Sequence, residues 1–151
     1  MPRPRKKRLV QHPPIHSAFK PCGVKPRHLT ELQLSLDEYE AIRLADFAGM
    51  DHESSAREMQ ISRSTFTRLL DQAHSKLASF LIEGKLLVIG GGSVHFSGNC
   101  FVCQDCGHIF YGQLEQEIKS CPMCDSKELQ DGADLHGHGQ CCLRWQNRDV
   151  E

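Results

Sequence analysis

In the middle of the chain, between Ser35 and Glu83, no proline interrupts a helical pattern of apolar positions. Ser62 is typical of a helix N-cap, and Gly84 is typical of a helix end. Between them, one apolar stripe recurs at helical spacing: Phe66, Leu69, Leu70, Ala73, Leu77, Phe80 and Leu81. This pattern predicts a long helix over residues 62–83.

Two shorter helices are predicted before the long one. Residues 35–38 (Ser-Leu-Asp-Glu) form a capping box, in which the serine hydroxyl and the glutamate carboxylate each satisfy a backbone N–H. The first helix should therefore begin here and end at Gly49. Asp51 is typical of a second cap, before a helix over His52–Met59. A short helix, a tight turn and a longer helix follow one another in a helix-turn-helix.

The polar face of the long helix carries candidate DNA contacts. Arginine can bind a guanine edge through two hydrogen bonds, and residues early in the second helix of this motif meet the bases. The residues expected to contact base edges are Arg63, Ser64 and Arg68, and those expected to contact the DNA backbone are Thr65 and Thr67. The alternative is an ordinary amphipathic three-helix bundle whose polar face is only solvated.

Residues 1–30 have the composition of an extended basic arm. They contain six of the seven prolines, which lack the N–H that helices and central strands use. They carry eight Lys or Arg and no acid, which leaves ten bases against nineteen acids for the rest of the chain. This asymmetry predicts contact with DNA phosphates, with insertion into a minor groove or a merely solvated tail as alternatives. The five bases expected to contact DNA are Arg3, Arg5, Lys6, Lys7 and Arg8.

Several functional classes are not expected. Apolar runs such as Leu86–Ile89 are far shorter than the roughly 18 to 20 residues of a membrane-spanning helix. Residues 10–14 interrupt any apolar core of a secretory signal, so we expect a cytoplasmic protein whose cysteines are metal ligands or redox thiols rather than disulfides. An enzyme is not expected, because there is no H-E-x-x-H motif and Gly90–Gly92 lacks the Lys-Ser/Thr of a P-loop. The oligomeric state stays open.

Three stretches of the helical region resemble the DNA-binding region 4 of sigma-70-type transcription factors. These are residues 36–46, Ala56–Met59 and Ser62–Leu70. Together with residues 1–6 and Phe19–Pro21, they make the chain similar to a family of small prokaryotic proteins called domain of unknown function 134, over residues 1–92. The resemblance implies a helix-turn-helix DNA-binding protein.

The resemblance also implies the positions of the DNA contacts, and these are again Arg63, Ser64 and Arg68. One position departs from the sigma-type pattern, because Gln60 stands where the turn usually has a left-handed glycine. That conformation costs a residue with a Cβ roughly 1 to 2 kcal/mol. Nothing resembles sigma region 2, so a complete promoter-melting sigma factor is not expected.

Two C-x-x-C pairs predict a metal site beyond the helices. Four thiolates from two tight turns form the tetrahedral set that structural zinc prefers, and the pattern resembles a zinc ribbon. Gly107 and Asp125, each directly after a pair, suit left-handed turn positions. The competing pair Cys100 with Cys103, an iron site of rubredoxin type, and a disulfide or free-thiol role stay open. The predicted zinc ligands are Cys103, Cys106, Cys121 and Cys124.

The C-terminal residues contain further candidate ligands. A second metal or thiol-sensing site is one interpretation, but three glycines in this stretch favour a flexible tail with incidental ligands. The residues in question are Cys100, His136, His138, Cys141 and Cys142. Cys22 is expected to be a lone thiol, and His95 shows no ligand spacing and is expected to be solvated or packed.

These features together predict a mainly α protein of four segments: a basic proline-rich arm (1–34), a three-helix helix-turn-helix domain (35–92), a small β-rich zinc-ribbon-like module (93–130) and a flexible tail (131–151). The expected function is sequence-specific binding of double-stranded DNA by a transcriptional regulator, with the long helix in the major groove. One alternative is a metal- or redox-responsive regulator that uses the C-terminal cysteines. The other is an adaptor associated with RNA polymerase.

Overall fold

The computed structural model describes residues 7–148. These residues divide into two compact units. The first, called the N-terminal unit here, comprises residues 7–9 and 16–94. The second, called the C-terminal unit, comprises residues 10–15 and 95–148. The predicted helix-turn-helix lies in the first unit, and the two C-x-x-C pairs lie in the second.

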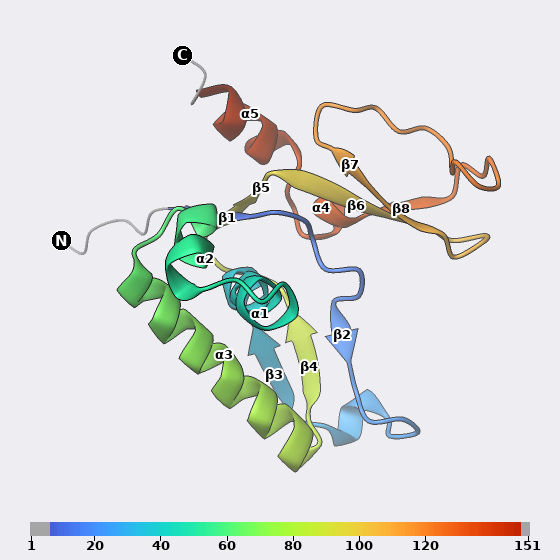
Figure 1. Cartoon of the computed structure of the whole chain (residues 1–151). Helices are drawn as coiled ribbons and strands as arrows, with labels where there is room; N and C mark the ends of the chain where they lie inside the picture. Colours follow the sequence, from blue (N-terminus) through green and yellow to red (C-terminus); the bar gives the residue numbers. More distant parts are fainter. Residues whose placement is uncertain (1–6, 149–151) are drawn as a thin grey trace. The chain divides into compact units, whose positions relative to one another are not determined.

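The N-terminal unit contains the three expected helices (Figure 1). They are α1 (Leu36–Ile42), α2 (His52–Met59) and α3 (Arg63–Glu83). α1 continues into a π-helical turn, η2 (Arg43–Phe47), and the chain leaves the helical conformation before Gly49, which has a φ of +70°. The helix boundaries therefore lie where the caps and glycines of the sequence place them.

Side chains cap all three helices at their N-termini. Ser35 and Glu38 form the expected capping box at α1. The Asp51 carboxylate accepts the Ser54 N–H at 2.7 Å, at the start of α2. The Ser62 hydroxyl accepts the N–H three residues later at 3.2 Å, at the start of α3. Each cap satisfies a backbone donor that has no partner within its helix, which is why the helices begin at these residues.

The three helices enclose one apolar core. It is formed by buried side chains from every helix: Ala41, Leu44, Ala56, Met59, Phe66, Leu69 and Leu70. The last buried residue of α3 is Ala73, and Leu81, near the end of the expected stripe, is 72% exposed. The core therefore holds the N-terminal half of α3, the half that carries the candidate DNA contacts.

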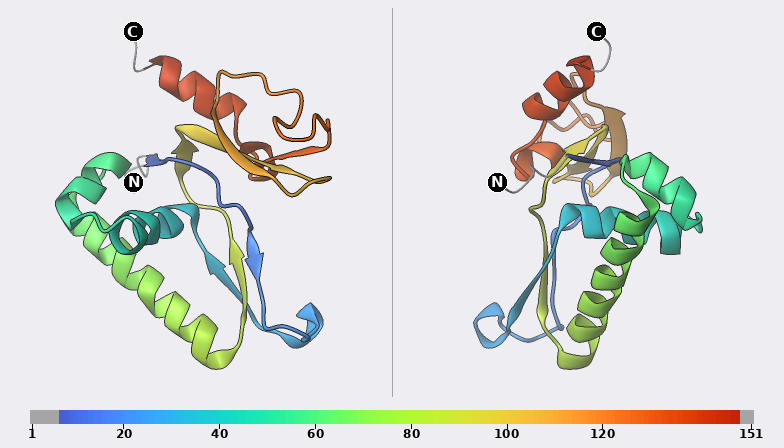
Figure 2. Two further views of the ribbon diagram at one scale, coloured as in Figure 1. Left: turned by 45° about the vertical axis from the view of Figure 1, so that its right-hand side comes forward. Right: turned by 90° about the vertical axis from the view of Figure 1, so that its left-hand side faces the viewer.

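A three-stranded sheet completes the N-terminal unit. Its order is β2 (Ala18–Phe19), β4 (Leu86–Ile89) and β3 (Glu31–Leu34). β4 is antiparallel to β2 and parallel to β3. Parallel strands need a long crossover connection, and here the three helices supply it. Figure 2 shows the two parallel strands side by side, with α3 next to them.

The C-terminal unit is built on a second three-stranded sheet. Its order is β7 (Ile109–Gln113), β6 (Gly98–Cys103) and β8 (Leu129–Asp131), and both pairings are antiparallel. Two helices follow β8, namely α4 (Gly132–Leu135) and α5 (Gln140–Arg148). β6 ends at Cys103, which is the first cysteine of the first C-x-x-C pair.

The remaining elements are short. β1 (Arg8–Val10) pairs with β5 (Val94–Phe96), and the chain passes from one unit to the other within each of these strands. A 3-10 turn, η1 (Pro26–His28), precedes β3. Within residues 7–148, no helix combines the length and the apolar character needed to cross a bilayer.

The prediction of a mainly α protein is wrong. Residues 7–148 contain eight strands in three sheets, and both units contribute to them. The segment expected to be an extended arm contains β1, β2 and β3, and the segment expected to be a flexible tail contains α4 and α5. Strands of two to four residues are too short to show an alternating pattern, and they form only against partners far along the chain.

Candidate functional site

A tight turn joins α2 to α3 and sets the geometry of the helix-turn-helix. Gln60 adopts the left-handed conformation that glycine usually has at this position, with φ of 58° and ψ of 42°, so the turn keeps its usual geometry and the glutamine bears the strain. The next N–H, that of Ile61, donates to the Ala56 carbonyl at 3.0 Å, and the Ile61 side chain packs against the helical core. The turn is therefore fixed by backbone hydrogen bonds and by apolar packing, without the usual glycine.

The first turns of α3 present some candidate contacts to solvent and use others inside the fold. Arg63, Ser64 and Arg68 are exposed. Thr65 is half-buried and its hydroxyl accepts a hydrogen bond from the hydroxyl of the N-cap serine at 2.8 Å. Thr67 is half-buried too, and its hydroxyl lies 3.0 Å from His52 Nδ1 on α2. The structure thus leaves the three base-edge candidates accessible, while Thr65 bonds to the N-cap of its own helix and Thr67 links α3 to α2.

A solvent-open groove of about 530 Å³ runs along α3 in the N-terminal unit. Its lining includes Arg68, Gln72 and Lys76 on one side and two acidic residues of α1 on the other. Both acids are paired. Asp37 Oδ2 lies 2.6 Å from the Arg8 guanidinium, and Glu38 Oε1 lies 2.6 Å from Lys76 Nζ. The internal ion pairs offset the negative charge that would otherwise repel a phosphate chain from this side of α3.

The structure describes only part of the predicted basic arm, from Lys7 onward. Lys7 is exposed. Arg8 belongs to β1 and is engaged in the ion pair with Asp37, so the structure gives this arginine a role inside the fold. The candidates Arg3, Arg5 and Lys6 lie outside the described residues.

The C-terminal unit brings together the four cysteines of the two C-x-x-C pairs. Their sulfur atoms all lie within 4.8 Å of one another. Two of the separations are 3.6 Å, between Cys103 and Cys124, and 3.7 Å, between Cys106 and Cys121. A tetrahedral zinc ion with Zn–S bonds of about 2.3 Å would place its sulfurs about 3.8 Å apart. The four sulfur atoms are therefore already spaced for a tetrahedral metal ion.

Each C-x-x-C pair sits on a short turn of defined conformation. The residues that follow the pairs, Gly107 and Asp125, have φ values of +76° and +62°. Their N–H groups donate to the carbonyls of Cys103 and Cys121, each at 2.9 Å. These are the left-handed positions expected from the sequence, and they fold the chain back so that both sulfurs of a pair point the same way.

Two of the clustered cysteines have pKa values that shift in opposite directions. The Cys106 N–H, which donates to the sulfur of Cys103, is the largest cause that lowers the pKa of Cys103 to about 7. For Cys124, the Ser126 N–H lowers the pKa, but desolvation and the three neighbouring thiols outweigh it and raise this pKa to about 12. Like charges at this separation disfavour one another, and a cation among the sulfurs removes that conflict.

The competing ligand set with Cys100 does not form. Cys100 is buried in β6 and lies outside the group of four sulfurs. Desolvation by burial raises the pKa of this thiol, as expected of a cysteine packed in a core. Cys22 is exposed and belongs to neither ligand group of residues 7–148.

A second group of potential ligands was only partly expected from the sequence. Ligand atoms of His95, His138, Cys141 and Cys142 lie within 4.8 Å of one another in the C-terminal unit. His136 is not a member of this group. The sequence pattern missed His95 because it lies on β5, far along the chain from the other three, and no spacing rule connects them.

Comparison with known proteins identifies relatives over most of the chain. Residues 1–97 match the family described as "Protein of unknown function DUF134". A UPF0251 protein of Chloroherpeton thalassium is 44% identical over 131 residues, which cover 87% of this chain and 87% of that protein. A UPF0251 protein of Moorella thermoacetica is 41% identical over 142 residues, which cover 93% of each chain.

The similarity extends into the C-terminal unit. A UPF0251 protein of Clostridium botulinum is 37% identical over 151 residues, which cover 98% of this chain and 94% of that protein. No solved structure matches the chain significantly. The names of these relatives state no activity, so a function has to be argued from the residues.

Proposed function

The chain belongs to the DUF134 family, whose description assigns no activity, and we propose that it is a sequence-specific DNA-binding protein that regulates transcription. In this proposal, α3 enters the major groove of double-stranded DNA. Arg63, Ser64 and Arg68 contact base edges there.

The observation that carries the proposal is the exposed polar surface on the first two turns of α3. Its three side chains are exposed, although the opposite face of the same turns is buried in the helical core. The hydrogen bond between Thr67 and His52 ties these turns to α2, so the exposed side chains are held on a rigid support. A rigid helix with exposed donors at its N-terminus is the arrangement that the helix-turn-helix uses to meet bases.

The charge distribution supports the same conclusion. Residues 1–30 carry eight bases and no acid. Phosphate contacts by such residues supply affinity without sequence information, while base contacts supply the selectivity. We assign the first role to the basic residues that precede β1 and the second to α3.

The C-terminal sulfur cluster fits zinc in a structural role within this protein. All four ligands are cysteines on two tight turns, and thiolate sets of this kind favour zinc. Zinc would be held by Cys103, Cys106, Cys121 and Cys124, and it would join the turn after β6 to the turn before β8. Four protein ligands leave no open position for a substrate, which is typical of a structural site.

The test begins with selection of bound sequences from a pool of random DNA duplexes, with the full-length protein. Affinities of wild type and Arg68→Ala are then measured on a selected site and on unselected DNA. If Arg68 binds a guanine edge, the substitution should cost about 1 to 3 kcal/mol on the selected site and much less on unselected DNA.

Lys119→Ala is the matched control, because it also removes one positive charge but belongs to the C-terminal unit, where its side chain is 78% exposed, and is not part of the helix-turn-helix. It should leave the preference for the selected site unchanged. An equal loss for Arg68→Ala on both DNAs would make Arg68 a phosphate contact. Failure of the selection to enrich any sequence would contradict specific DNA binding.

A further inference from the structure

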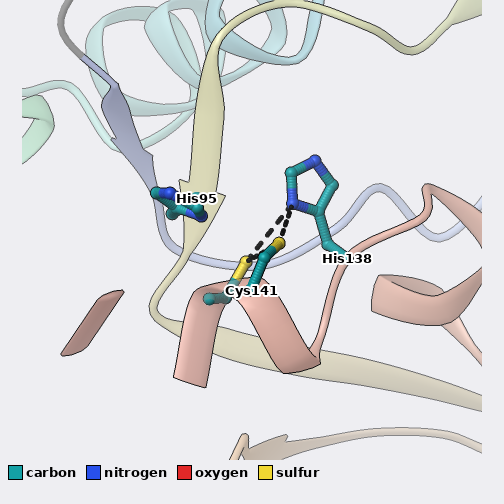
Figure 3. Close-up of side chains that lie close together, drawn as sticks. His95, His138 and Cys141 are labelled. Carbon is teal, nitrogen blue, oxygen red and sulfur yellow. Dashed lines mark hydrogen bonds between the residues drawn. The ribbon is translucent and has the colours of Figure 1, made fainter. Parts of the chain in front are cut away.

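Four ligand-bearing side chains converge in the C-terminal unit, apart from the sulfur cluster described above. Figure 3 shows three of them: His95 from β5, His138 from the loop before α5, and Cys141 from the first turn of α5. Cys142 is the fourth, and all four ligand atoms lie within 4.8 Å of one another. No sequence motif brings them together, because the group depends on how α5 packs in its own unit.

Three of the separations among these ligand atoms, those within His138, Cys141 and Cys142, match a tetrahedral metal centre. His138 Nδ1 lies 3.2 Å from Cys141 Sγ and 3.4 Å from Cys142 Sγ, and the two sulfurs are 3.9 Å apart. With Zn–N bonds of about 2.0 Å and Zn–S bonds of about 2.3 Å, a tetrahedral ion separates nitrogen from sulfur by about 3.5 Å and sulfur from sulfur by about 3.8 Å. His138, Cys141 and Cys142 therefore need little movement to accept an ion, and a ring nitrogen of His95 lies within 4.8 Å of all three.

The surroundings hold the ligands in place. The Phe96 N–H donates to Cys142 Sγ at 3.1 Å, and such a donor stabilises a thiolate ligand. His95 is 8% exposed, and its ring stacks on Trp145 with 5.2 Å between ring centroids. The His138 ring packs against the edge of Phe96, with centroids 5.2 Å apart. The packing of the His95 and His138 rings and the N–H donor at Cys142 thus preorganise the ligands for a metal ion.

We propose that His95, His138, Cys141 and Cys142 bind a second transition-metal ion, of which zinc is the best match to two imidazoles and two thiolates. On binding, each of the two thiols releases its proton to solvent, and the two imidazoles are neutral. The ion would fasten α5 to β5 within the C-terminal unit. This proposal does not depend on DNA binding, since it concerns residues outside the helix-turn-helix.

One side of the site is open to solvent, which gives the ion a way in. Cys141 is exposed, and with His95, Arg144 and Trp145 it lines a small pocket of about 220 Å³. The sulfur cluster and this second site differ in donor set, with four sulfurs in one and two nitrogens and two sulfurs in the other. The two sites can therefore be distinguished by spectroscopy as well as by mutation.

The test measures zinc in the full-length protein, purified with a reductant and passed into metal-free buffer. Wild type should hold about two zinc ions per chain, and Cys141→Ser and Cys142→Ser should each hold about one. His95→Gln should also lose one ion, and far-UV and near-UV circular dichroism would verify that each variant is folded. In a Cys103→Ser background, substituted Co²⁺ should give the absorption of a site with two nitrogen and two sulfur ligands.

The matched controls are Cys22→Ser and His136→Ala, which remove one thiol and one imidazole outside both ligand groups. Both should keep the wild-type metal content. Retention of all bound metal by folded Cys141→Ser and His95→Gln would overturn the second site. DNA binding can fail in its own test while this zinc count holds, so the two proposals are judged separately.

Discussion

At individual positions, Gln60 shows how a local conformation can prevail over the preference of a residue. Its φ of 58° lies in the left-handed region, which favours glycine. The N–H of Gln60 donates to the Arg57 carbonyl at 3.1 Å, and the buried side chains on either side of the turn fix the path of the chain. The fold therefore imposes a backbone conformation that costs this side chain roughly 1 to 2 kcal/mol.

We expect Gln60→Gly to stabilise the N-terminal unit. Glycine relieves the left-handed strain but loses more backbone entropy on folding, so the net gain should be about 0.5 to 1 kcal/mol. Urea unfolding followed by helical circular dichroism measures this change. Gln60→Ala is the control, because alanine keeps the Cβ and should bring no comparable gain. A less stable glycine variant would show that the glutamine side chain makes a favourable interaction at the turn.

Arg8 and Thr67 show a second effect at single positions. Both have side chains suited to DNA, and both are used inside the protein: Arg8 pairs with Asp37, and Thr67 meets His52. Residue type alone does not reveal such a partner, because the partner comes from another element. The candidate DNA surface of α3 therefore narrows to Arg63, Ser64 and Arg68.

Among the secondary-structure elements, the helices and the cysteine turns are stabilised by different means. α1, α2 and α3 share an apolar core and have side-chain caps. The strands β6, β7 and β8 belong to a separate unit, in which cysteine turns adjoin the sheet. A metal ion is thus expected to stabilise the second group of elements and to leave the first unaffected.

This difference predicts the result of removing a proposed zinc ligand. Cys103→Ser and Cys124→Ser should each release about one zinc ion per chain, because three thiolates bind the ion far more weakly than four. The helical signal of the N-terminal unit in the circular dichroism spectrum should remain, because the core of this unit contains no cysteine.

Zinc content and thermal unfolding of the two variants, beside Cys22→Ser as a control, check the prediction. Full zinc content in both variants would contradict the assignment of these ligands. Loss of the helical signal along with the metal would show that the two units unfold together.

At the scale of the whole molecule, the property that bears most on the proposed DNA binding is the uneven distribution of charge along the chain. The net charge is −1, yet residues 1–30 contain eight of the eighteen bases and none of the nineteen acids. A phosphate chain releases bound counterions when such a segment neutralises it, so the affinity of the complex should depend steeply on salt. The steepness of this salt dependence measures how many basic residues contact phosphates.

Replacement of Arg3, Arg5, Lys6 and Lys7 by alanine should reduce the slope of log affinity against log salt by at most about 3.6. Arg8 is left intact because its pairing with Asp37 belongs to the fold. Titrations of wild type and variant at several salt concentrations measure the slope. If these residues contact only phosphates, selected and unselected DNA should lose affinity to a similar extent.

Sites with A·T-rich and G·C-rich flanks extend the same experiment. Arginines in a minor groove would make the loss depend on the A·T content of the flank, whereas phosphate contacts would not. A slope equal to that of wild type would contradict a role of the four bases in DNA binding.

The helices of the N-terminal unit and the turns around the C-x-x-C pairs could be predicted from the chain alone. Helical hydrogen bonds join residues four positions apart, and the caps at Ser35, Asp51 and Ser62 act on the next few residues, so the signals are local. The same is true of the left-handed positions Gly107 and Asp125, which directly follow the second cysteine of each pair. Features of this kind depend on residues that are neighbours in the sequence, and they can therefore be predicted from it.

Other features depend on residues that meet only after folding. β3 and β4 are short, and their parallel pairing joins segments on either side of all three helices. The ligand group of His95, His138 and the two adjacent cysteines arises from β5, a loop and α5, and the pairing of Arg8 with Asp37 joins a strand to a helix. Neither periodicity nor spacing carries this information, because each contact gains its free energy from packing between segments that are remote in the chain.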